Sequence, residues 1–125
     1  RSDVEMNVLR ARKPLFVKLS DGGIRNRYTV KILNKRHDAR QYALKIEGLT
    51  NSVVTLAGGA IGETPSGLTV RGDRLRSFRI MVTVPMTTIK GAATAIAFRL
   101  EDIGNGVMTK TDSTFRAPAI RSRSP

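Results

Sequence analysis

The sequence contains no cysteine and no tryptophan, and aromatic residues make up only 5% of its 125 residues. Without cysteine the chain forms no disulfide, and it lacks a thiolate for a zinc or iron–sulfur site and a thiol nucleophile. Histidine, the side chain that most often transfers protons at neutral pH, occurs once. The composition therefore argues against an enzyme contained wholly within these residues.

Long apolar runs are absent as well. The longest lie near Ile80–Met86 and Ala92–Phe98, far short of the roughly 20 residues that a membrane-spanning helix needs. The chain begins at Arg1 rather than methionine and shows no signal peptide, so we expect it to be a fragment of a longer protein. The missing targeting signals then say nothing about where the parent protein is located.

What the chain has in excess is positive charge. Lys and Arg number 22 against 10 Asp and Glu, which gives a net charge of +12, while 40% of the residues are hydrophobic. This balance fits one globular domain with a real core. The charge favours an anionic partner, either nucleic acid or an anionic membrane surface. A solvated basic face is the alternative, because the charges are spread out rather than clustered.

Between Arg27 and Gly48 the sequence shows two stretches of alternating apolar and polar residues. Alternation with a period of two places one set of side chains against a core and the other toward water or a partner. The segment Asn34–Arg40 between them is charged and contains His37 and Asp38, and Asp favours turns. We therefore predict a pair of antiparallel strands joined by a polar turn, and we expect the rest of the chain to fold onto this pair.

Further short strands separated by turn signals account for most of the remaining chain. The clearest alternation runs from Arg74 to Val84, and another strand is predicted from Ala93 to Asp102. No segment shows a convincing helical period, and about seven or eight strands at this spacing indicate an all-β fold, an immunoglobulin-like β-sandwich of two antiparallel sheets. The predicted core consists of Phe16, Tyr28, Val30, Ile32, Tyr42, Leu44, Ile46, Phe78, Ile80, Val82, Ile96, Phe98 and Leu100.

Residues that catalyse reactions or bind metals are sparse and scattered. His37 lies in a predicted turn with no serine nucleophile or paired carboxylate in register, so we interpret it as a surface histidine. The glycine-rich segment Ala57–Gly67 is a loop that matches no phosphate-binding pattern. No spacing typical of metal ligands emerges. One alternative stays open, a Cu(I) site formed by thioethers, with Met6, Met81, Met86 and Met108 as its ligands.

Nucleic-acid binding is a second alternative, because basic residues surround the central pair of strands. Such binding needs basic side chains interleaved with exposed aromatics, and most aromatics here fall on the predicted inner faces. A salt-sensitive mode that ignores base sequence is the most that this pattern supports. The surface would consist of Arg25, Arg27, Lys31, Lys35, Arg36, Arg40 and Lys45.

Three phrases of the sequence carry a family resemblance: NVLRARKPLFVKLSDGGIRNRYTVKILNK (Asn7–Lys35), YALKIEGL (Tyr42–Leu49) and RSFRIMVTVP (Arg76–Pro85). They resemble the C-terminal domain of the FixG/CcoG family of cytochrome c oxidase accessory proteins. The resemblance is dense in the first third of the chain and loose after Gly48. The matching residues are Val8, Arg10, Arg12, Pro14, Leu15, Phe16, Ser20, Asp21, Gly22, Ile24, Arg25, Asn26, Tyr28, Thr29, Lys31, Ile32, Asn34 and Lys35.

What the resemblance implies concerns a parent protein larger than this chain. Family members look like inner-membrane proteins with transmembrane helices, cysteine motifs for two [4Fe-4S] clusters and a final immunoglobulin-like domain in the periplasm. The resemblance implies that they support copper delivery and assembly of a cbb-class cytochrome c oxidase by reducing copper. This chain has no cysteine, so we expect no catalytic, cofactor or metal site within it, and the clusters would lie before Arg1.

The implied role is a non-catalytic periplasmic interaction module whose partner is an oxidase subunit or a copper carrier, not nucleic acid. We expect residues 1–13 to be a linker or edge segment after a membrane helix, 14–117 the sandwich, and 118–125 a disordered basic tail. The contacts are expected in two turns, Ser20–Arg27 and Asn34–Arg40. Turn shaping is the alternative for Asp21, Gly22 and Asn26, and a solvated charged loop is the alternative for the second turn. The candidates are Ser20, Asp21, Arg25, Asn26, Arg27, Lys35, Arg36 and His37.

Overall fold

Strands form nearly all of the regular structure in residues 3–119, the part of the chain that this computed structural model describes. The helical element among them is η1 (Met86–Thr88), a single 3-10 turn. The strands are β1 (Val4–Arg10), β2 (Val17–Lys18), β3 (Gly23–Asn34), β4 (Arg40–Glu47), β5 (Val53–Ala57), β6 (Leu68–Val70), β7 (Arg74–Pro85), β8 (Ala93–Asp102) and β9 (Met108–Arg116).

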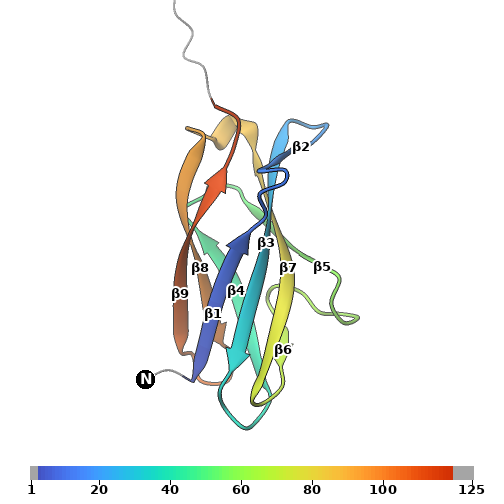
Figure 1. The fold of residues 1–125 in the computed structure, drawn as a ribbon, viewed down its shortest axis with the longest axis vertical. Helices are drawn as coiled ribbons and strands as arrows, with labels where there is room; N and C mark the ends of the chain where they lie inside the picture. Colours follow the sequence, from blue (N-terminus) through green and yellow to red (C-terminus); the bar gives the residue numbers. More distant parts are fainter. Residues whose placement is uncertain (1–2, 120–125) are drawn as a thin grey trace, which may run out of the picture.

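Two antiparallel sheets pack face to face, which confirms the predicted fold class (Figure 1). Sheet A has the strand order β1-β3-β7-β5, with the short β2 also paired to β3, and sheet B has the order β6-β4-β8-β9. The described residues form nine strands rather than seven or eight. The additional strand is β1, which lies within the N-terminal segment and pairs with β3 along its whole length.

The predicted pairing of the two central strands is wrong. β3 and β4 run in opposite directions, but β3 belongs to sheet A and β4 to sheet B (Figure 1). β3 pairs with β1 and β7, whereas β4 pairs with β6 and β8. Alternation shows which face of a strand is buried but not which strand lies beside it. The turn between β3 and β4 therefore crosses from one sheet to the other.

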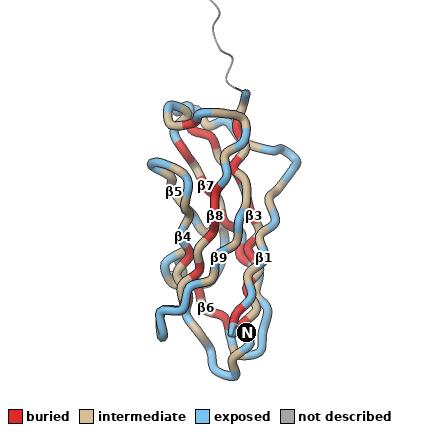
Figure 2. The backbone as a smooth tube through the Cα atoms, turned by 90° about the vertical axis from the view of Figure 1, so that its left-hand side faces the viewer, coloured by how far each residue is buried: buried red, intermediate tan, exposed pale blue. Residues whose placement is uncertain are grey.

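The core lies between the sheets, and Figure 2 marks in red the buried residues along the strands that enclose it. The predicted core residues are all buried except Phe16 and Ile46, which are half-buried and pack against the core. The ring of Tyr28 in β3 meets that of Phe98 in β8 edge-on, with 4.9 Å between centroids, so the two sheets touch directly. The core prediction missed Val4, Ile24, Leu68, Val70, Val84, Ile89, Phe115 and Ala117.

The two predicted end segments differ in how much of them is described. Most of the first, residues 1–13, is occupied by β1. Most of the second, the basic tail predicted to be disordered, lies in residues 120–125 and therefore outside the described residues, as do residues 1–2.

Candidate functional site

The residues predicted as partner contacts fall at the two ends of β3. Ser20 and Asp21 precede the first residue of this strand, and Lys35, Arg36 and His37 follow its last. β3 has 12 residues, so its ends lie about 36 Å apart at the usual rise of about 3.3 Å per residue. The structure does not bring the two segments together, and only the outer face of sheet A connects them.

The first segment is shaped by its own hydrogen bonds. The backbone N–H of Gly23 donates to Asp21 Oδ1 at 2.9 Å, and the backbone N–H of Leu19 donates to the carbonyl of Gly23 at 2.8 Å. Gly22 has φ +88°, a conformation that glycine adopts without steric cost. Asp21 thus has a turn-shaping role, which was the alternative to partner contact, although it remains exposed.

Asn26 is not available as a partner contact, because it is completely buried. Its side-chain amide donates from Nδ2 to the Arg116 carbonyl at 2.7 Å, and its Oδ1 accepts the Arg116 backbone N–H at 2.7 Å. These two bonds join β3 of sheet A to the end of β9 in sheet B. Asn26 therefore neither contacts a partner nor shapes the turn, the two roles that the sequence offered, but holds the two sheets together. We name this pair of bonds the Asn26 clasp.

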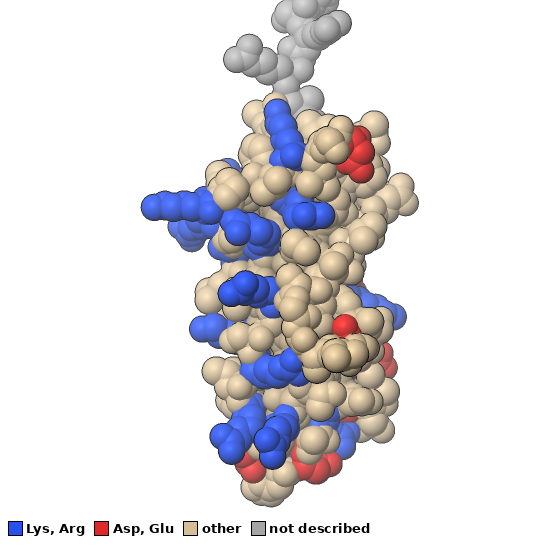
Figure 3. Space-filling view, turned by 90° about the vertical axis from the view of Figure 1, so that its right-hand side faces the viewer, with Lys and Arg blue, Asp and Glu red and all other residues tan. Residues whose placement is uncertain are grey.

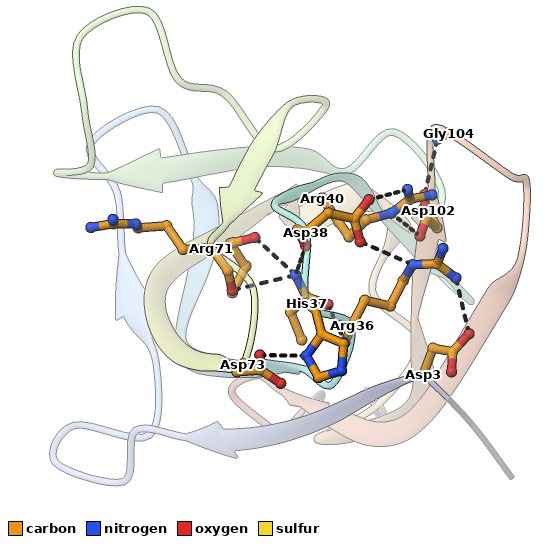
Figure 4. Close-up of polar contacts among 11 residues, drawn as sticks. Asp3, Arg36, His37, Asp38, Arg40, Arg71, Asp73, Asp102 and Gly104 are labelled. Carbon is orange, nitrogen blue, oxygen red and sulfur yellow. Dashed lines mark hydrogen bonds and ion pairs between the residues drawn. The ribbon is translucent and has the colours of Figure 1, made fainter.

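The second segment belongs to a cluster of charged side chains at the β3–β4 turn (Figure 4). Its innermost pair joins Arg40 to Asp102, with Arg40 Nε and Nη2 donating to the two carboxylate oxygens at 2.9 and 2.8 Å. Burial of Asp102 opposes its ionisation, yet hydrogen bonds from Arg40 and from the Gly104 N–H outweigh burial and lower its pKa. This buried pair ties the start of β4 to the end of β8.

The predicted contact residues of this segment lie on the outside of the cluster. Arg36 contacts the carboxylates of Asp3 and Asp38, at 3.2 and 3.3 Å. The almost fully exposed ring of His37 lies with Nδ1 2.8 Å from Asp73 Oδ2. The hydrogen bond and charge of Asp73 raise the His37 pKa. His37 is thus a surface histidine with one carboxylate partner, as the sequence predicts.

A buried asparagine, Asn34, organises this end of the sandwich. Its Nδ2 lies within hydrogen-bond distance of the carbonyls of Asp38, Val70 and Arg71, at 2.9, 3.1 and 3.3 Å, and its Oδ1 accepts the Arg36 N–H. These bonds hold the β3–β4 turn against the β6–β7 turn. The sequence carried no signal for this role, because hydrogen bonds to backbone carbonyls follow no residue pattern.

Between the two ends of β3, the outward-facing positions of sheet A carry an excess of positive charge. Within its strands, the one outward-facing carboxylate is Glu5, and it is paired with Lys35. Figure 3 shows Lys and Arg side chains along the length of the side of the molecule that bears β7 and β5. We call the outward-facing basic side chains on β3 and β7 the basic face; they are Arg25, Arg27, Lys31 and Arg79.

The outer face of sheet B is balanced by comparison. Its outward-facing charged residues alternate in sign, and Glu47 accepts ion pairs from Arg99 at 2.8 Å and Lys110 at 3.4 Å. The basic set is Lys45, Arg99 and Lys110, and the acidic set is Glu47, Glu101 and Asp112. The excess positive charge of the strands therefore lies on the outer face of sheet A and not on that of sheet B.

The glycine-rich loop between β5 and β6 is held by an ion pair that the sequence analysis missed. Arg76 Nη1 and Nη2 donate to the two carboxylate oxygens of Glu63 at 2.6 and 2.7 Å. Glu63 also accepts the backbone N–H groups of Ala60 and Thr69. The hydrogen bonds from Arg76, and then those from the backbone, lower the Glu63 pKa to about 2. The pair anchors the loop to β7.

The methionines of the open copper alternative lie on four different elements. Met6 is on β1, Met81 on β7, Met86 in η1 and Met108 on β9. Met6 and Met86 are half-buried and pack against the core, which is the ordinary use of this side chain. Residues 3–119 contain no group of three or more His, Cys, Asp or Glu placed to hold a metal ion, and none of their helices is long and apolar enough to cross a membrane.

The architecture and the surface together define a class: an immunoglobulin-like β-sandwich domain with one basic face. The family model described as "IG-like fold at C-terminal of FixG, putative oxidoreductase" matches residues 1–118. The chain therefore belongs to the FixG C-terminal domain family, as its sequence resemblance indicates.

Curated relatives and a solved structure agree with this assignment. The chain is 32% identical over 124 residues to "Nitrogen fixation protein FixG" of Rhizobium meliloti, covering 98% of this chain and 24% of that protein. It is 32% identical over 117 residues to "Protein RdxB" of Cereibacter sphaeroides, covering 92% and 24%. The crystal structure of a FixG-related protein from Vibrio parahaemolyticus has the same fold, with a TM-score of 0.79 and 22% identity over 94% of this chain and 99% of that one. The chain thus spans about a quarter of the length of its curated relatives.

Proposed function

We propose that this domain is a non-catalytic interaction module of a larger FixG-type protein, which holds it on the periplasmic side of the inner membrane. There it would contact an oxidase subunit or a copper carrier and support copper delivery and assembly of a cbb-class cytochrome c oxidase. The observation that carries the proposal is the family match, which covers residues 1–118 of this chain. The remaining three quarters of the relatives lie outside the chain, and two [4Fe-4S] clusters with their cysteine ligands belong to that part of the parent protein in this proposal.

The basic face is the surface that we assign to the contact. Side chains on rigid strands are held more precisely than side chains on loops, which favours a defined interface. The face is rich in arginine, which is enriched at protein interfaces, and it favours a partner whose surface is acidic. The exposed Leu9 and Val53, 48% and 60% accessible on the neighbouring strands, add apolar area beside the charges.

The direct test uses charge reversal in the parent protein. Arg27→Glu with Lys31→Glu reverses two charges of the basic face, and Lys45→Glu with Lys110→Glu makes the same change on sheet B. We expect the first variant to lose cross-linking to its partner and to lower cbb oxidase activity in membranes, and the control to retain both. Deleting residues 3–119 from the parent should have the larger effect, and unchanged oxidase activity and copper content after that deletion would refute the proposed role.

The location is tested separately by protease accessibility. An antibody against the domain is used on spheroplasts of the native host before and after protease is added outside. We expect a membrane protein much larger than this chain that is trimmed from outside. A form that stays protected until lysis would contradict the periplasmic placement without touching the assignment of the contact face.

Nucleic-acid binding is kept as a second candidate because the basic face would also attract phosphates. The outward-facing positions of β1, β3, β5 and β7 hold no Phe or Tyr, so the described part of this face offers no stacking platform for bases. Binding of labelled DNA is measured as salt is raised from low to physiological concentration. Binding that persists at physiological salt and is lost with Arg27→Glu would favour this candidate over the protein partner.

A further inference from the structure

The lower half of β7 has an open edge on the side of β5. β5 pairs with β7 only from Arg79 to Thr83, whereas β3 pairs with β7 from Arg74 to Pro85. Residues Arg74–Phe78 therefore have a strand neighbour on one side only. Among residues 3–119, no backbone hydrogen bond from a loop or turn reaches these five residues either. An unpaired strand edge presents a row of N–H and C=O groups that another strand can bind.

The chain leaves this position free because of two glycines. Directly after Ala57, the last residue of β5, Gly58 and Gly59 have φ values of +77° and +89°. These left-handed conformations turn the chain away from β7, and Figure 1 shows the loop swinging out beside the sandwich. The space that a longer β5 would fill stays empty.

The empty space forms a groove. Its larger part, about 800 Å³, lies between the β5–β6 loop, β6 and the first residues of β7, and it is lined in part by Ile61, Arg71 and Leu75. A smaller part of about 330 Å³ continues along β7 past Ser77. Arg76 lines both parts. Ile61 and Leu75 are exposed large apolar side chains at its rim. The groove therefore offers a backbone edge and apolar contact area together.

Two arginines of the groove, Arg71 and Arg74, carry positive charge that no carboxylate of the groove neutralises. Its one carboxylate, Glu63, has both oxygens engaged by Arg76. No ion pair within residues 3–119 involves the side chains of Arg71 or Arg74, and in Figure 4 the Arg71 side chain points away from the charged cluster at the β3–β4 turn. A second copy of this edge is a poor occupant, because antiparallel pairing would bring Arg76 opposite Arg76. Complementary charge instead favours an acidic segment.

We propose that the open edge of β7 at Arg74–Phe78 binds an extended acidic segment of a partner protein as an added strand. The segment continues the line of β5, forms backbone hydrogen bonds to β7, and directs alternate carboxylates toward Arg71 and Arg74. Its apolar side chains contact Leu75 and Ile61. The proposal rests on the proposed function in one respect, that the ligand is a protein, and it assigns that protein a chemistry and a binding mode.

The test uses an unlabelled octapeptide of alternating Val and Glu, added to the isotopically labelled 125-residue chain and followed by NMR. We expect saturable shifts centred on the amides of Arg74–Phe78, and the peptide in which Lys replaces Glu should bind about tenfold more weakly. An N-methylated form of the Val–Glu peptide keeps the charge but cannot form the ladder, and it should lose about as much affinity. Equal binding of the N-methylated peptide would overturn strand addition.

Charge-reversal variants complete the test. Arg71→Glu with Arg74→Glu should weaken binding of the Val–Glu peptide about tenfold, whereas Lys45→Glu with Lys110→Glu should leave it unchanged. Absence of any shift at about 1 mM peptide, or shifts confined to Arg25–Leu33, would refute the proposal. A protein ligand would also be refuted if anionic lipid vesicles or DNA displaced the bound Val–Glu peptide as well as an excess of the same peptide does. If the peptide binds as expected but deletion of residues 3–119 from the parent protein leaves oxidase activity unchanged, only the proposed function is refuted.

Discussion

Removing the Asn26 clasp should lower the free energy of unfolding by an amount that can be worked out from its two hydrogen bonds. Asn26→Ala deletes the 2.7 Å bonds that the side-chain amide forms with both backbone groups of Arg116. Each group then loses its partner in a partly buried place, at a cost of about 1–3 kcal/mol for each group. Because Arg116 is half-buried rather than buried, the lower part of this range applies to each, and we expect the free energy of unfolding to fall by about 2–3 kcal/mol.

Thermal unfolding followed by circular dichroism measures this loss. For a domain of this size, 1 kcal/mol corresponds to a change in Tm of about 4 °C, so Asn26→Ala should lower the Tm by about 10 °C. Asn7→Ala is the matched control, since Asn7 is an exposed asparagine on β1. It should change the free energy of unfolding by less than about 0.5 kcal/mol.

A third variant separates hydrogen bonding from the loss of side-chain volume. Asn26→Asp keeps an acceptor for the Arg116 N–H but sets a carboxylate oxygen against the Arg116 carbonyl. At neutral pH this substitution should lower the free energy of unfolding as much as alanine does. The loss relative to wild type should be smaller at acidic pH, because the protonated carboxyl can donate a hydrogen bond to the Arg116 carbonyl. A Tm for Asn26→Ala within about 2 °C of that for Asn7→Ala would refute the contribution assigned to these two hydrogen bonds.

Three further predictions follow from single contacts. The Glu63 pKa of about 2 lies below its unfolded value, so its ionised form stabilises the fold above the unfolded pKa, and this stabilisation is lost as the pH falls toward 2. Urea unfolding should therefore show a smaller loss of stability between pH 5 and pH 2.5 for Glu63→Gln than for wild type, and parallel losses would contradict this. A Cβ on Gly72 would lie 2.1 Å from the His37 carbonyl oxygen, so Gly72→Ala should cost about 2 kcal/mol or more in chemical denaturation, while Gly91→Ala, which meets nothing, should be nearly neutral. The raised His37 pKa means that its pairing stabilises the fold at acidic pH and is lost as the pH rises through that pKa; NMR titration of this single histidine should give a value above 6.5 that falls in Asp73→Asn, and an unchanged value would exclude the pair.

The strands were predictable where alternation was long. β7 and β8 carry an apolar residue at every second position over most of their length, and the structure forms both over the predicted ranges. Short or irregular elements were harder. β6 has three residues, too few to show a period, yet Leu68 and Val70 are completely buried because they belong to the core between the two sheets. Short patterns explain the misses on β6, whereas Ile24 and Val84 were missed at the ends of the long strands β3 and β7.

The candidate site was predictable in composition but not in position. The charge total indicated an anionic partner, whereas the separation into a basic sheet A and a balanced sheet B depends on strand register. The fold also sets Arg76 beside Glu63 of the β5–β6 loop, and it leaves Arg74–Phe78 without a strand neighbour on the β5 side. Neither feature can be read from the sequence, because each depends on how segments far apart in the chain are placed, and no local pattern records that placement.

By itself, then, the amino-acid sequence determined the all-β class, the inward face of each long strand and the family, because alternation and local motifs are properties of neighbouring residues. The tertiary structure decided which strands pair and which polar residues are buried. It placed β3 and β4 in different sheets, turned Asn26 from a predicted contact into an intersheet clasp, and opened the edge of β7. These outcomes depend on how distant segments satisfy each other's backbone hydrogen bonds, and that requirement is met only when the whole sandwich is assembled.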